Sequence, residues 1–312
     1  MPDYVVGVDL GGTKLVAGQV APDGKVTREH YAPTDVAAGP GGVLAQVAAA
    51  IRRVSEPQPP AAIGLGVPGL VDVNTGACLF SPNLFWRDVP VAQIVSESLS
   101  LPVFIDNDVN VATLGEHRLG AGRGYRNLIM VTIGTGIGAG LVVEGRLYRG
   151  PGGSAGELGH VPVDPAGQVC NCGNRGCLET TCSGPAMARR AAQLVTPSSM
   201  LWRRHQPLDA RAVFEAARCG DQLALELVRE TAAWLGMGLA GVVNLLNPEL
   251  IIVGGGVAAA GGLLLEPLRE NIKRRALPHP AAMVEVAVAA LGARAGVAGA
   301  GLLAWDGVQG AP

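Results

Sequence analysis

Apolar residues follow two spacings along the chain, one typical of buried strands and the other of helices. Short apolar runs bounded by glycine, proline or polar residues predict strands; they cover residues 5–10, 15–20, 25–32, 62–67, 103–105, 128–133, 141–143, 249–253 and 284–288. Apolar positions repeating every three to four residues predict helices; they cover residues 41–54, 91–99, 109–115, 184–245 with a loop near 197–208, 263–275 and 295–305. Strands that alternate with helices indicate an α/β fold.

One pattern, a strand followed by a turn of glycine and threonine and then a second strand, occurs twice. The first copy carries Gly11, Gly12, Thr13 and Lys14 in its turn, and the second carries the turn 134–140. Repetition at this scale predicts two related α/β halves. The backbone amides of such a turn can surround a phosphate, so we expect each half to contribute one phosphate-binding hairpin to a shared cleft. The alternative for each turn alone is an ordinary hairpin, because both differ from the Walker and dinucleotide patterns, which open a helix.

Other strands end in residues that are suited to ligand binding. The strand 103–105 leads into the Asp-Asn-Asp sequence 106–108, and the strand 249–253 leads into three glycines at 254–256. Ligands of open α/β sheets bind at the carboxyl ends of the strands. Asp9, near the end of the first strand, is placed in the same way to hold a magnesium ion or its waters. The alternatives are a helix N-cap for the aspartate at 108 and a tight strand–helix connection at 254–256.

The composition is that of a globular protein and excludes several classes. Of the 312 residues, 48% are hydrophobic and 16% are charged, and the net charge of -2 offers no electrostatic footprint for nucleic acid or an anionic membrane. The most apolar region, 234–246, is interrupted by glycine and is shorter than the roughly 20 residues of a membrane span, so we expect a buried helix. The N-terminus lacks the pattern of a secretory signal. These features predict a cytoplasmic, soluble protein that binds neither nucleic acid nor membrane.

Three of the six cysteines lie in the segment 153–179 together with a histidine. Cys170, Cys172 and Cys177 form a C-x-C-x4-C pattern, and His160 precedes the first of them by ten positions. Three thiolates and one imidazole complete a tetrahedral zinc shell with no position left for water, which predicts a structural metal. The alternatives are three free thiols in a loop, or one disulfide with a thiol to spare. Cysteines at metal spacing without a disulfide framework also fit a reducing compartment.

The order of the motifs resembles that of the ROK family of sugar kinases and sugar-responsive repressors. The motifs are DLGGTK, VPG, SPNL, NDVN, IGTGIGAG, GELGH, CNCGNRGCLE and VGGG, and they extend over nearly the whole chain. Within that family the chain looks most similar to the bacterial ATP-dependent glucokinases. The resemblance implies an α/β, actin-like (RNase H-like) two-lobe sugar kinase fold with a duplicated βββαβαβα core and an interlobe cleft. It also implies a small lobe of residues 1–112 with about 298–312, and a large lobe of residues 113–297 that contains the metal segment.

The resemblance assigns a role to each motif. Asp108 matches the catalytic base, and Asp9 matches a carboxylate on the magnesium side. The residues that match sugar contacts are Gly69, Asn83, Asn107, Asp108, Glu157, His160 and Glu179. The residues that match nucleotide contacts are Gly11, Gly12, Thr13, Lys14, Thr135, Gly136, Gly254, Gly255 and Gly256. The alternative for Lys14 is a solvated lysine of the turn. The residues that match ligands of a structural Zn²⁺ are His160, Cys170, Cys172 and Cys177, and pure metal ligation is the alternative to a mixed role of the histidine.

These roles imply transfer of the γ-phosphate of ATP, bound with Mg²⁺, to the 6-hydroxyl of glucose. Kinases for mannose, fructose, allose or N-acetylmannosamine are alternatives, because the motifs specify the chemistry better than the sugar; polyphosphate is an alternative donor. A sugar-sensing repressor is the alternative from another class, but the first strand begins near Tyr4, so we expect no DNA-binding domain before it. A non-catalytic actin-like ATPase would have no use for the sugar-binding residues. The resemblance further implies a homodimer or homotetramer.

Overall fold

The computed structural model describes residues 3–55, 57–203 and 208–310. The chain forms two compact units: unit 1 contains Met1–Gly124, Gly140–Ala155 and Ala290–Pro312, and unit 2 contains Tyr125–Ala139 and Gly156–Ala289. The lobe limits expected from the sequence stay a prediction; their boundaries, after residues 112 and 297, fall inside two helices that unit 1 contains whole. Part of the loop predicted near 197–208, namely residues 204–207, lies outside the described residues.

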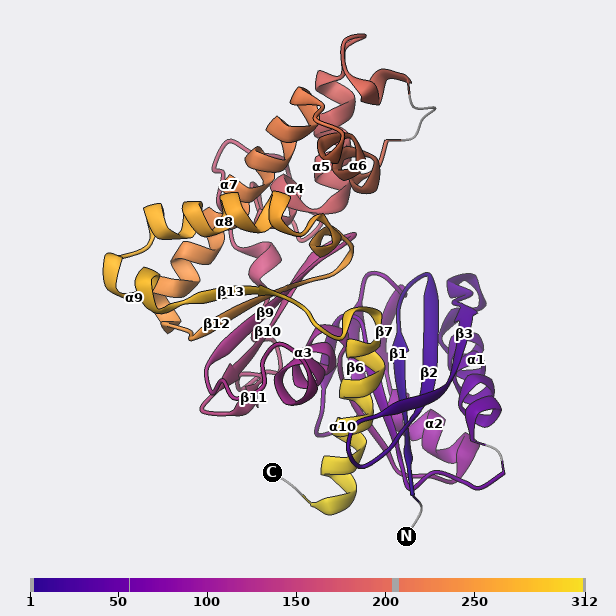
Figure 1. Ribbon diagram of the computed structural model, residues 1–312. Helices are drawn as coiled ribbons and strands as arrows, with labels where there is room; N and C mark the ends of the chain where they lie inside the picture. Colours follow the sequence, from indigo (N-terminus) through magenta and orange to yellow (C-terminus); the bar gives the residue numbers. More distant parts are fainter. Residues whose placement is uncertain (1–2, 56, 204–207, 311–312) are drawn as a thin grey trace. The chain divides into compact units, whose positions relative to one another are not determined.

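Unit 1 consists of strands with four helices packed around them (Figure 1). Its strands are β1 (Val5–Leu10), β2 (Lys14–Val20), β3 (Val26–Pro33), β4 (Ile63–Val67), β5 (Leu70–Asp72), β6 (Ala77–Ser81), β7 (Trp86–Val89), β8 (Val103–Asn107) and β11 (Arg146–Tyr148). Its helices are α1 (Gly39–Val54), α2 (Val91–Leu99), α3 (Asp108–Leu119) and α10 (Ala295–Gln309), with the 3-10 turns η1 (Val36–Ala38) and η5 (Gly292–Arg294).

Unit 2 is mainly helical. Its strands are β9 (Leu128–Ile133), β12 (Leu250–Gly254), β13 (Glu285–Val288) and the first part of β10 (Ile137–Val143), which ends in unit 1. Its α-helices are α4 (Leu178–Cys182), α5 (Gly184–Leu194), α6 (Ala210–Arg218), α7 (Gln222–Leu246), α8 (Gly262–Arg275) and α9 (Pro278–Met283). Its 3-10 turns are η2 (Leu158–His160), η3 (Met200–Arg203) and η4 (Gly256–Ala260).

Two five-stranded sheets have the same strand order, and this confirms the predicted duplication. The orders are β3-β2-β1-β4-β8 and β11-β10-β9-β12-β13. In the first sheet β1 pairs antiparallel with β2 and parallel with β4, and in the second β9 and β13 both pair parallel with β12. The second copy carries α4–α7 where the first has α1 alone, and α3 and α10 close the two copies. The chain therefore contains the βββαβαβα core twice.

The sequence patterns missed some short elements. The sheet β5-β6-β7 was not predicted, because its strands have three to five residues and only partial alternation of buried and exposed positions. Strand β10 begins at Ile137 rather than at residue 141, since its alternation is hidden by glycines; the predicted turn 134–140 is therefore reduced to residues 134–136. Helices α4 and α9 are too short to show a helical period.

The core of unit 1 has one layer on each side of its large sheet. Val6, Val8 and Leu10 of β1 lie in a cluster of buried residues with the apolar faces of α1 and α2, while Val5 packs with Val297 of α10 on the opposite side. This is the result expected for successive side chains of a strand, which point to alternate faces. Helices thus cover both faces of the sheet, which leaves the ends of its strands for ligand binding.

Glycines allow α10 to lie directly on the sheet. A Cβ atom added to Gly7 of β1 would be 2.1 Å from the carbonyl oxygen of Val297, and one added to Gly64 of β4 would be 1.7 Å from that of Ala300. Since no side chain fits in these gaps, the helix backbone packs on the strand backbones. This approach brings the N-terminus of α10 to the carboxyl end of β1.

The apolar region 234–246 forms the C-terminal half of α7. Leu235, Leu239 and Val243 are buried there, at the spacing of one helical face, so the expected buried helix is confirmed for that face, whereas Leu245 and Leu246 at its end are 82% and 45% exposed. Among the residues that the structure describes, no helix is both long enough and apolar enough to cross a membrane.

Candidate active site and metal centre

In unit 1 the predicted site residues lie at the carboxyl ends of three neighbouring parallel strands. Asp9 is the penultimate residue of β1, Gly69 follows β4 and Asn107 ends β8. These strands pair parallel in the order β1-β4-β8. The carboxyl ends of parallel strands are where open α/β sheets bind ligands, so three segments that are distant in sequence meet at one edge of the sheet.

Asp9 lies against the first turn of α10. A Cβ atom added to Gly296 would be 2.5 Å from both Cγ and Oδ2 of Asp9, so a larger residue there would displace the carboxylate. Burial raises the pKa of this carboxyl group, and the positive charge of Lys14 acts in the opposite direction. Carboxylate oxygen is a preferred ligand of Mg²⁺, and a helix N-terminus favours negative charge. The position fits the predicted magnesium-side role.

The turn 11–14 joins β1 to β2. The amide of Gly11 donates to the carbonyl of Lys14 at 2.8 Å, and the hydroxyl of Thr34 donates to the carbonyl of Gly11 at 2.8 Å. The amide of Thr34 in turn donates to the carbonyl of Thr13 at 3.1 Å. The side chains of Thr13 and Lys14 are exposed. The carbonyls of the turn are thus held by the protein.

The loop that carries Asn83 packs on this turn. A Cβ atom added to Gly12 would lie 3.0 Å from the carbonyl oxygen of Asn83. Leu84 and Trp86 are each only 1% exposed and anchor the loop, whereas Phe85 between them is 86% exposed with a left-handed φ of 55°. The structure therefore brings the predicted sugar-binding loop next to the first predicted phosphate-binding turn.

Asn107, and not Asp108, is the N-cap of α3. Its Oδ1 accepts hydrogen bonds from the amides of Val109 (2.8 Å) and Asn110 (3.2 Å), and its Nδ2 donates to the carbonyl of Gly69 at 2.9 Å. The capping alternative for Asp108 is therefore wrong: Asp108 is the first helical residue, although its Oδ1 also lies 3.0 Å from the Val109 amide. Because its amide oxygen is occupied, Asn107 can offer a sugar hydroxyl only an N–H donor.

Gly69 is required by its backbone geometry. Its φ is +109°, and a Cβ atom there would lie 2.2 Å from the carbonyl oxygen of Phe80. Both facts exclude a side chain at this position. With its carbonyl bound by Asn107, Gly69 fixes the distance between the end of β4 and the end of β8.

An ion pair between the buried carboxylate of Asp106 and the partly exposed Arg149, which the sequence patterns missed, holds the strand–helix turn in front of Asp108. Asp106 is 1% exposed; its Oδ1 accepts from the amide of Asn107 (2.7 Å) and from Nδ2 of Asn110 (2.9 Å). Its Oδ2 accepts from Nε of Arg149 at 2.6 Å. The Asp-Asn-Asp sequence did mark Asp106, but its arginine partner comes from beyond β11 and could not be found from spacing.

In unit 2 the two predicted nucleotide turns follow neighbouring parallel strands, β9 and β12. Gly254 is the register partner of Thr132, and a Cβ atom on Gly255 would lie 2.4 Å from the carbonyl oxygen of Ile133. The φ of +80° at Gly255 likewise favours glycine. The turn 254–256 therefore lies against the end of β9, immediately before the turn 134–136, in which the side chain of Thr135 is exposed.

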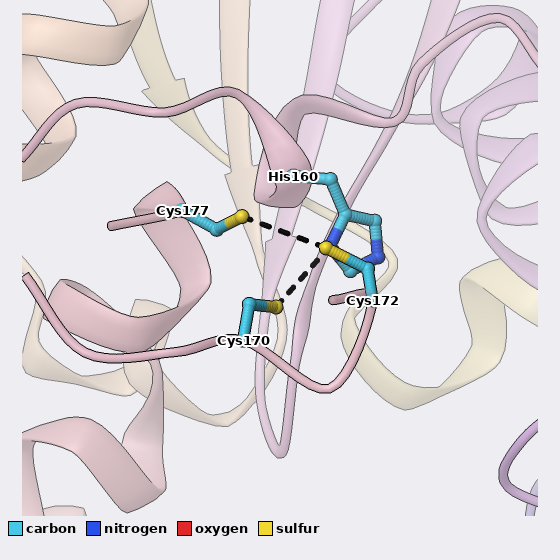
Figure 2. Close-up of side chains that lie close together, drawn as sticks. All are labelled: His160, Cys170, Cys172 and Cys177. Atoms are coloured by element: carbon cyan, nitrogen blue, oxygen red, sulfur yellow. Dashed lines mark hydrogen bonds between the residues drawn. The ribbon is translucent and has the colours of Figure 1, made fainter. Parts of the chain in front are cut away.

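The four predicted metal ligands converge on one point in unit 2 (Figure 2). Their ligand atoms all lie within 4.8 Å of one another. Sγ of Cys172 is 3.7 Å from Sγ of Cys177, and Sγ of Cys170 is 3.6 Å from Nδ1 of His160. These cysteines are free, and the separation between the sulfurs of Cys172 and Cys177 is too long for a disulfide bond. The disulfide alternative is therefore wrong for them.

The dimensions of the cluster fit zinc. With usual Zn–S and Zn–N bonds, a tetrahedral ion holds two sulfurs about 3.8 Å apart and a sulfur and a nitrogen about 3.6 Å apart. Burial and the neighbouring thiols raise the pKa of Cys177 to about 12, while a backbone hydrogen bond at Asn174 lowers the pKa of Cys172. Three thiolates this close together need a cation between them. The residues and their spacing are therefore consistent with a structural Zn²⁺.

The two ring nitrogens of His160 face different partners. Nδ1 is directed to the thiol cluster, and Nε2 lies 3.9 Å from Oε2 of Glu157. The side chains of His160 and Glu157 are 39% and 50% exposed. A histidine that binds a metal through one nitrogen commonly donates from the other. Nε2 therefore remains accessible for a sugar hydroxyl, as the predicted role of His160 in binding both metal and sugar requires.

Glu179 lies in the first turn of α4, two residues after the metal ligand Cys177, which is the N-cap of that helix. Its Oε2 accepts a hydrogen bond from the amide of Ile137 at 2.9 Å. Sequence reasoning had placed Glu179 among the sugar ligands but had not connected it to the turn between β9 and β10. The predicted site residues thus form two groups, one in each unit.

Comparisons with known proteins cover almost the full chain. The ROK family model matches residues 5–306. A glucokinase of Halalkalibacterium halodurans is 39% identical over an alignment of 311 residues, gaps included, that covers 96% of this chain and 94% of that protein. The crystal structure of a ROK family glucokinase from Streptomyces griseus in complex with glucose and AMPPNP is 37% identical, with a TM-score of 0.86 over 97% of this chain and 99% of that one. A xylose repressor of Caldicellulosiruptor bescii is 33% identical over 95% of this chain and 76% of the repressor.

The likeness to solved structures confirms the expected fold class. The two duplicated sheets form the mixed α/β, actin-like architecture of ROK proteins, in kinases and regulators alike. Fold by itself does not choose between these activities, since one fold carries many functions. The choice depends on the residues of the site.

Proposed function

Because the chain belongs to the ROK family, we propose that it is a glucokinase that transfers the γ-phosphate of Mg-ATP to the 6-hydroxyl of glucose. The observation that carries this proposal is the position of Asp108. Its half-buried carboxylate belongs to the first residue of α3, at the carboxyl end of β8, and the turn before it is held by the ion pair of the buried Asp106 carboxylate with Arg149. A sugar-binding regulator needs no rigidly placed base there.

Asp108 acts as the general base in this proposal. Its carboxylate accepts the proton of the 6-hydroxyl as that oxygen attacks the γ-phosphorus atom. The oxygen forms a bond to phosphorus while the bond from phosphorus to the bridging oxygen of ADP breaks. The N-cap at Asn107 and the hydrogen bonds of Asp106 hold the carboxylate, so that little reorganisation is needed during the reaction.

The sugar ligands in this proposal are amides, carboxylates and one imidazole. Asn107 donates from the N–H that the Gly69 carbonyl leaves unused, and Asn83 offers a complete amide. Glu157 and Glu179 accept from hydroxyls, and His160 donates from Nε2. The zinc cluster positions these last groups, since His160 is itself a ligand and Cys177 caps the helix that carries Glu179.

The phosphates are held by backbone amides of the turns 11–14, 134–136 and 254–256, with Lys14 as an additional cation. Asp9 would hold Mg²⁺ or its waters, and the metal would supply charge neutralisation at the phosphates when bound. The likeness to a ROK glucokinase that holds glucose and AMPPNP supports this choice of substrates.

The relatives include both glucokinases and xylose repressors, so an experiment must decide between kinase and regulator. Purified protein is assayed by coupled detection of ADP and sugar phosphate across glucose, mannose, fructose, allose and N-acetylmannosamine, with ATP or polyphosphate as donor. We expect the highest kcat/KM for glucose with ATP. Preference for another hexose would correct the substrate, and no phosphorylation of any of them, with xylose or glucose still binding, would favour a regulator of the kind represented by the xylose repressors.

The variant Asp108→Asn tests the base directly. It should retain the fold and glucose binding but lose turnover by on the order of 10²–10⁴, the usual contribution of a general base. The matched control is Asp88→Asn, at an exposed aspartate of β7 outside the site. Circular dichroism and calorimetric glucose titration show whether fold and binding are intact. A kcat of Asp108→Asn close to that of the control would contradict the assignment.

A further inference from the structure

The carboxylate of Glu179 is part of the turn between β9 and β10. Its Oε2 accepts the amide N–H of Ile137 at 2.9 Å, and a Cβ atom added to Gly136 would lie only 2.4 Å from that same oxygen. Glycine at 136 therefore keeps the space that the carboxylate occupies. The contact joins a predicted sugar ligand to a predicted nucleotide-binding turn within one unit of the structure.

Backbone hydrogen bonds hold the residues on either side of this contact. The amide of Gly184 donates to the carbonyl of Gly134 at 2.9 Å, and the amide of Ala139 donates to the carbonyl of Gly156 at 3.0 Å. These bonds hold Gly134 at the start of the turn and Ala139 in β10. Glu179 supplies a side-chain acceptor to the amide of Ile137, the first residue of β10, directly after the turn whose amides would face a phosphate.

Glu179 has little freedom to move away. Leu178 before it is 0% exposed, and Cys177 is both the N-cap of α4 and a member of the thiol cluster. With Oε2 bound to the turn, Oε1 is the oxygen left for a sugar hydroxyl. A carboxylate oxygen has two acceptor directions, so the two oxygens can serve two sites at once.

We infer that Glu179 is a positioning residue shared by the sugar and the nucleotide, so that each ligand strengthens binding of the other. The inference rests on the proposed function. A hydroxyl bound to Oε1 fixes the carboxylate and with it the Ile137 amide, which orders the turn before the phosphates arrive. Binding free energies are linked, so the nucleotide strengthens sugar binding by the same factor.

Electrostatics alone would give the opposite sign. A carboxylate close to a phosphate-binding turn repels the negative charges of ATP. If repulsion dominated, removing the charge of Glu179 would tighten nucleotide binding. The hydrogen bond to Ile137 and the space kept at Gly136 indicate that the ordering effect is the larger one, and the amide variant separates the two effects because it loses the charge but retains an acceptor oxygen.

The test is calorimetric titration of zinc-loaded protein with AMPPNP and Mg²⁺, with and without saturating glucose. In the wild type, glucose should lower the Kd of AMPPNP by about 5-fold or more, the lower end of ordinary coupling. Without sugar, Glu179→Ala should raise that Kd roughly tenfold, as expected for a lost hydrogen bond to a charged group. Glu179→Gln should keep the wild-type nucleotide Kd without sugar, although both variants bind glucose poorly.

Glu157→Ala is the matched control, since it removes another predicted sugar carboxylate. The Oε2 atom of Glu157 lies 3.9 Å from Nε2 of His160, rather than on the turn. It should weaken glucose binding and leave the Kd of AMPPNP unchanged. Gly136→Ala is the second perturbation, because its methyl group displaces Oε2 while Glu179 itself is retained; it should weaken AMPPNP binding and reduce the coupling. Zinc content, measured for each variant, should equal that of the wild type.

The outcomes separate the inference from the proposed function. If the wild type phosphorylates glucose but Glu179→Ala binds AMPPNP as well as Glu157→Ala does, the inference is overturned and the proposed function stands. Tighter AMPPNP binding by both Glu179 variants would also overturn it, in favour of repulsion. A wild type that binds glucose and AMPPNP without phosphorylating glucose would refute the proposed function. In that case, loss of the coupling between glucose and AMPPNP binding only in Glu179→Ala and Gly136→Ala would still support the shared carboxylate.

Discussion

Gly299 lies where helices α3 and α10 pack with their backbones in contact, and its replacement by alanine should destabilise unit 1. A Cβ atom on Gly299 would lie 1.6 Å from the carbonyl oxygen of Val111 and 2.9 Å from the amide nitrogen of Gly115. Gly115 presents the same restriction in return, because its Cβ atom would be 2.6 Å from the carbonyl oxygen of Ala295. The two glycines face each other across the helix pair.

The cost follows from the distance that has to be recovered. Ordinary van der Waals contact begins at 3.4 Å, so α10 would have to move away from Val111 by close to 2 Å, and the obstacle is backbone that cannot rotate aside. Overpacking usually costs about 1–3 kcal/mol, occasionally more. The gain in helix propensity from Gly to Ala returns at most about 1 kcal/mol. Because a backbone carbonyl cannot rotate aside, we take the overpacking cost at or slightly above the upper end of its range, about 3–4 kcal/mol, and expect a net loss of roughly 2–3 kcal/mol.

Gly241 provides the matched control. It lies inside α7, it is exposed, and no atom would be within 4 Å of its added Cβ atom. Gly241→Ala therefore receives the propensity gain without a clash, up to about 1 kcal/mol. The same chemical change in two helices should have opposite signs, and the difference isolates the packing of α3 on α10.

Thermal unfolding followed by circular dichroism measures both effects. For units of this size a change of 1 kcal/mol corresponds to roughly 2–4 °C in Tm. Gly299→Ala should therefore lower the Tm by about 5–10 °C, while Gly241→Ala should raise it by a few degrees. Because α3 begins at Asp108, kcat of Gly299→Ala should also fall at temperatures where the variant is fully folded. A Tm of Gly299→Ala equal to or above that of the wild type would refute the reasoning.

Two further predictions concern the metal and a strained loop. Cys172→Ser should lose zinc and thermal stability together, because metal binding is coupled to folding, whereas Cys219→Ser, at an exposed thiol outside the cluster, should change neither; full zinc occupancy of Cys172→Ser by elemental analysis would contradict this. Phe85→Gly should increase the free energy of unfolding by about 0.5–1 kcal/mol after the entropic cost of glycine, and so raise the Tm, since glycine relieves a left-handed φ of 55° at an 86% exposed position. Phe85→Ala keeps the Cβ atom and should show no gain; an equal gain in both variants would locate the effect in the aromatic ring instead.

Much of the fold follows from local sequence patterns. The apolar runs located the strands of both five-stranded sheets except β11, because a buried strand must be apolar wherever it lies. The recurrence of strand, Gly/Thr turn and strand indicated two halves, and the strand orders bear this out. The predicted strand at residues 141–143 was wrong by four residues at its start, since glycine hides alternation.

The metal centre was also accessible from the sequence, for a physical reason. Its three cysteines lie within eight residues, and a short glycine-containing loop can bring such neighbours together without help from the rest of the chain. The histidine arrives from ten residues earlier in the same segment. Ligand type and spacing therefore predict the cluster before any tertiary contact is known.

Hydrogen-bond partners were not accessible in this way. Glu116 is 0% exposed on α3, and its carboxylate accepts from the amides of Ala121 (2.9 Å), Ala290 (3.0 Å) and Leu291 (2.7 Å). No pattern relates a glutamate to amides more than 170 positions away. The same is true of the pair between Asp106 and Arg149, and of the bond from Ile137 to Glu179.

The sequence by itself determined which segments are buried, which residue types stand at strand ends, and which four side chains can form a zinc shell. Tertiary structure alone decided that Asn107 caps α3 and leaves Asp108 as the first helical residue, that Gly299 packs against Val111, and that Glu179 accepts a hydrogen bond from the amide of Ile137. The reason is that periodicity encodes only whether a face meets the core. Which polar group it meets there depends on the approach of segments that are distant along the chain.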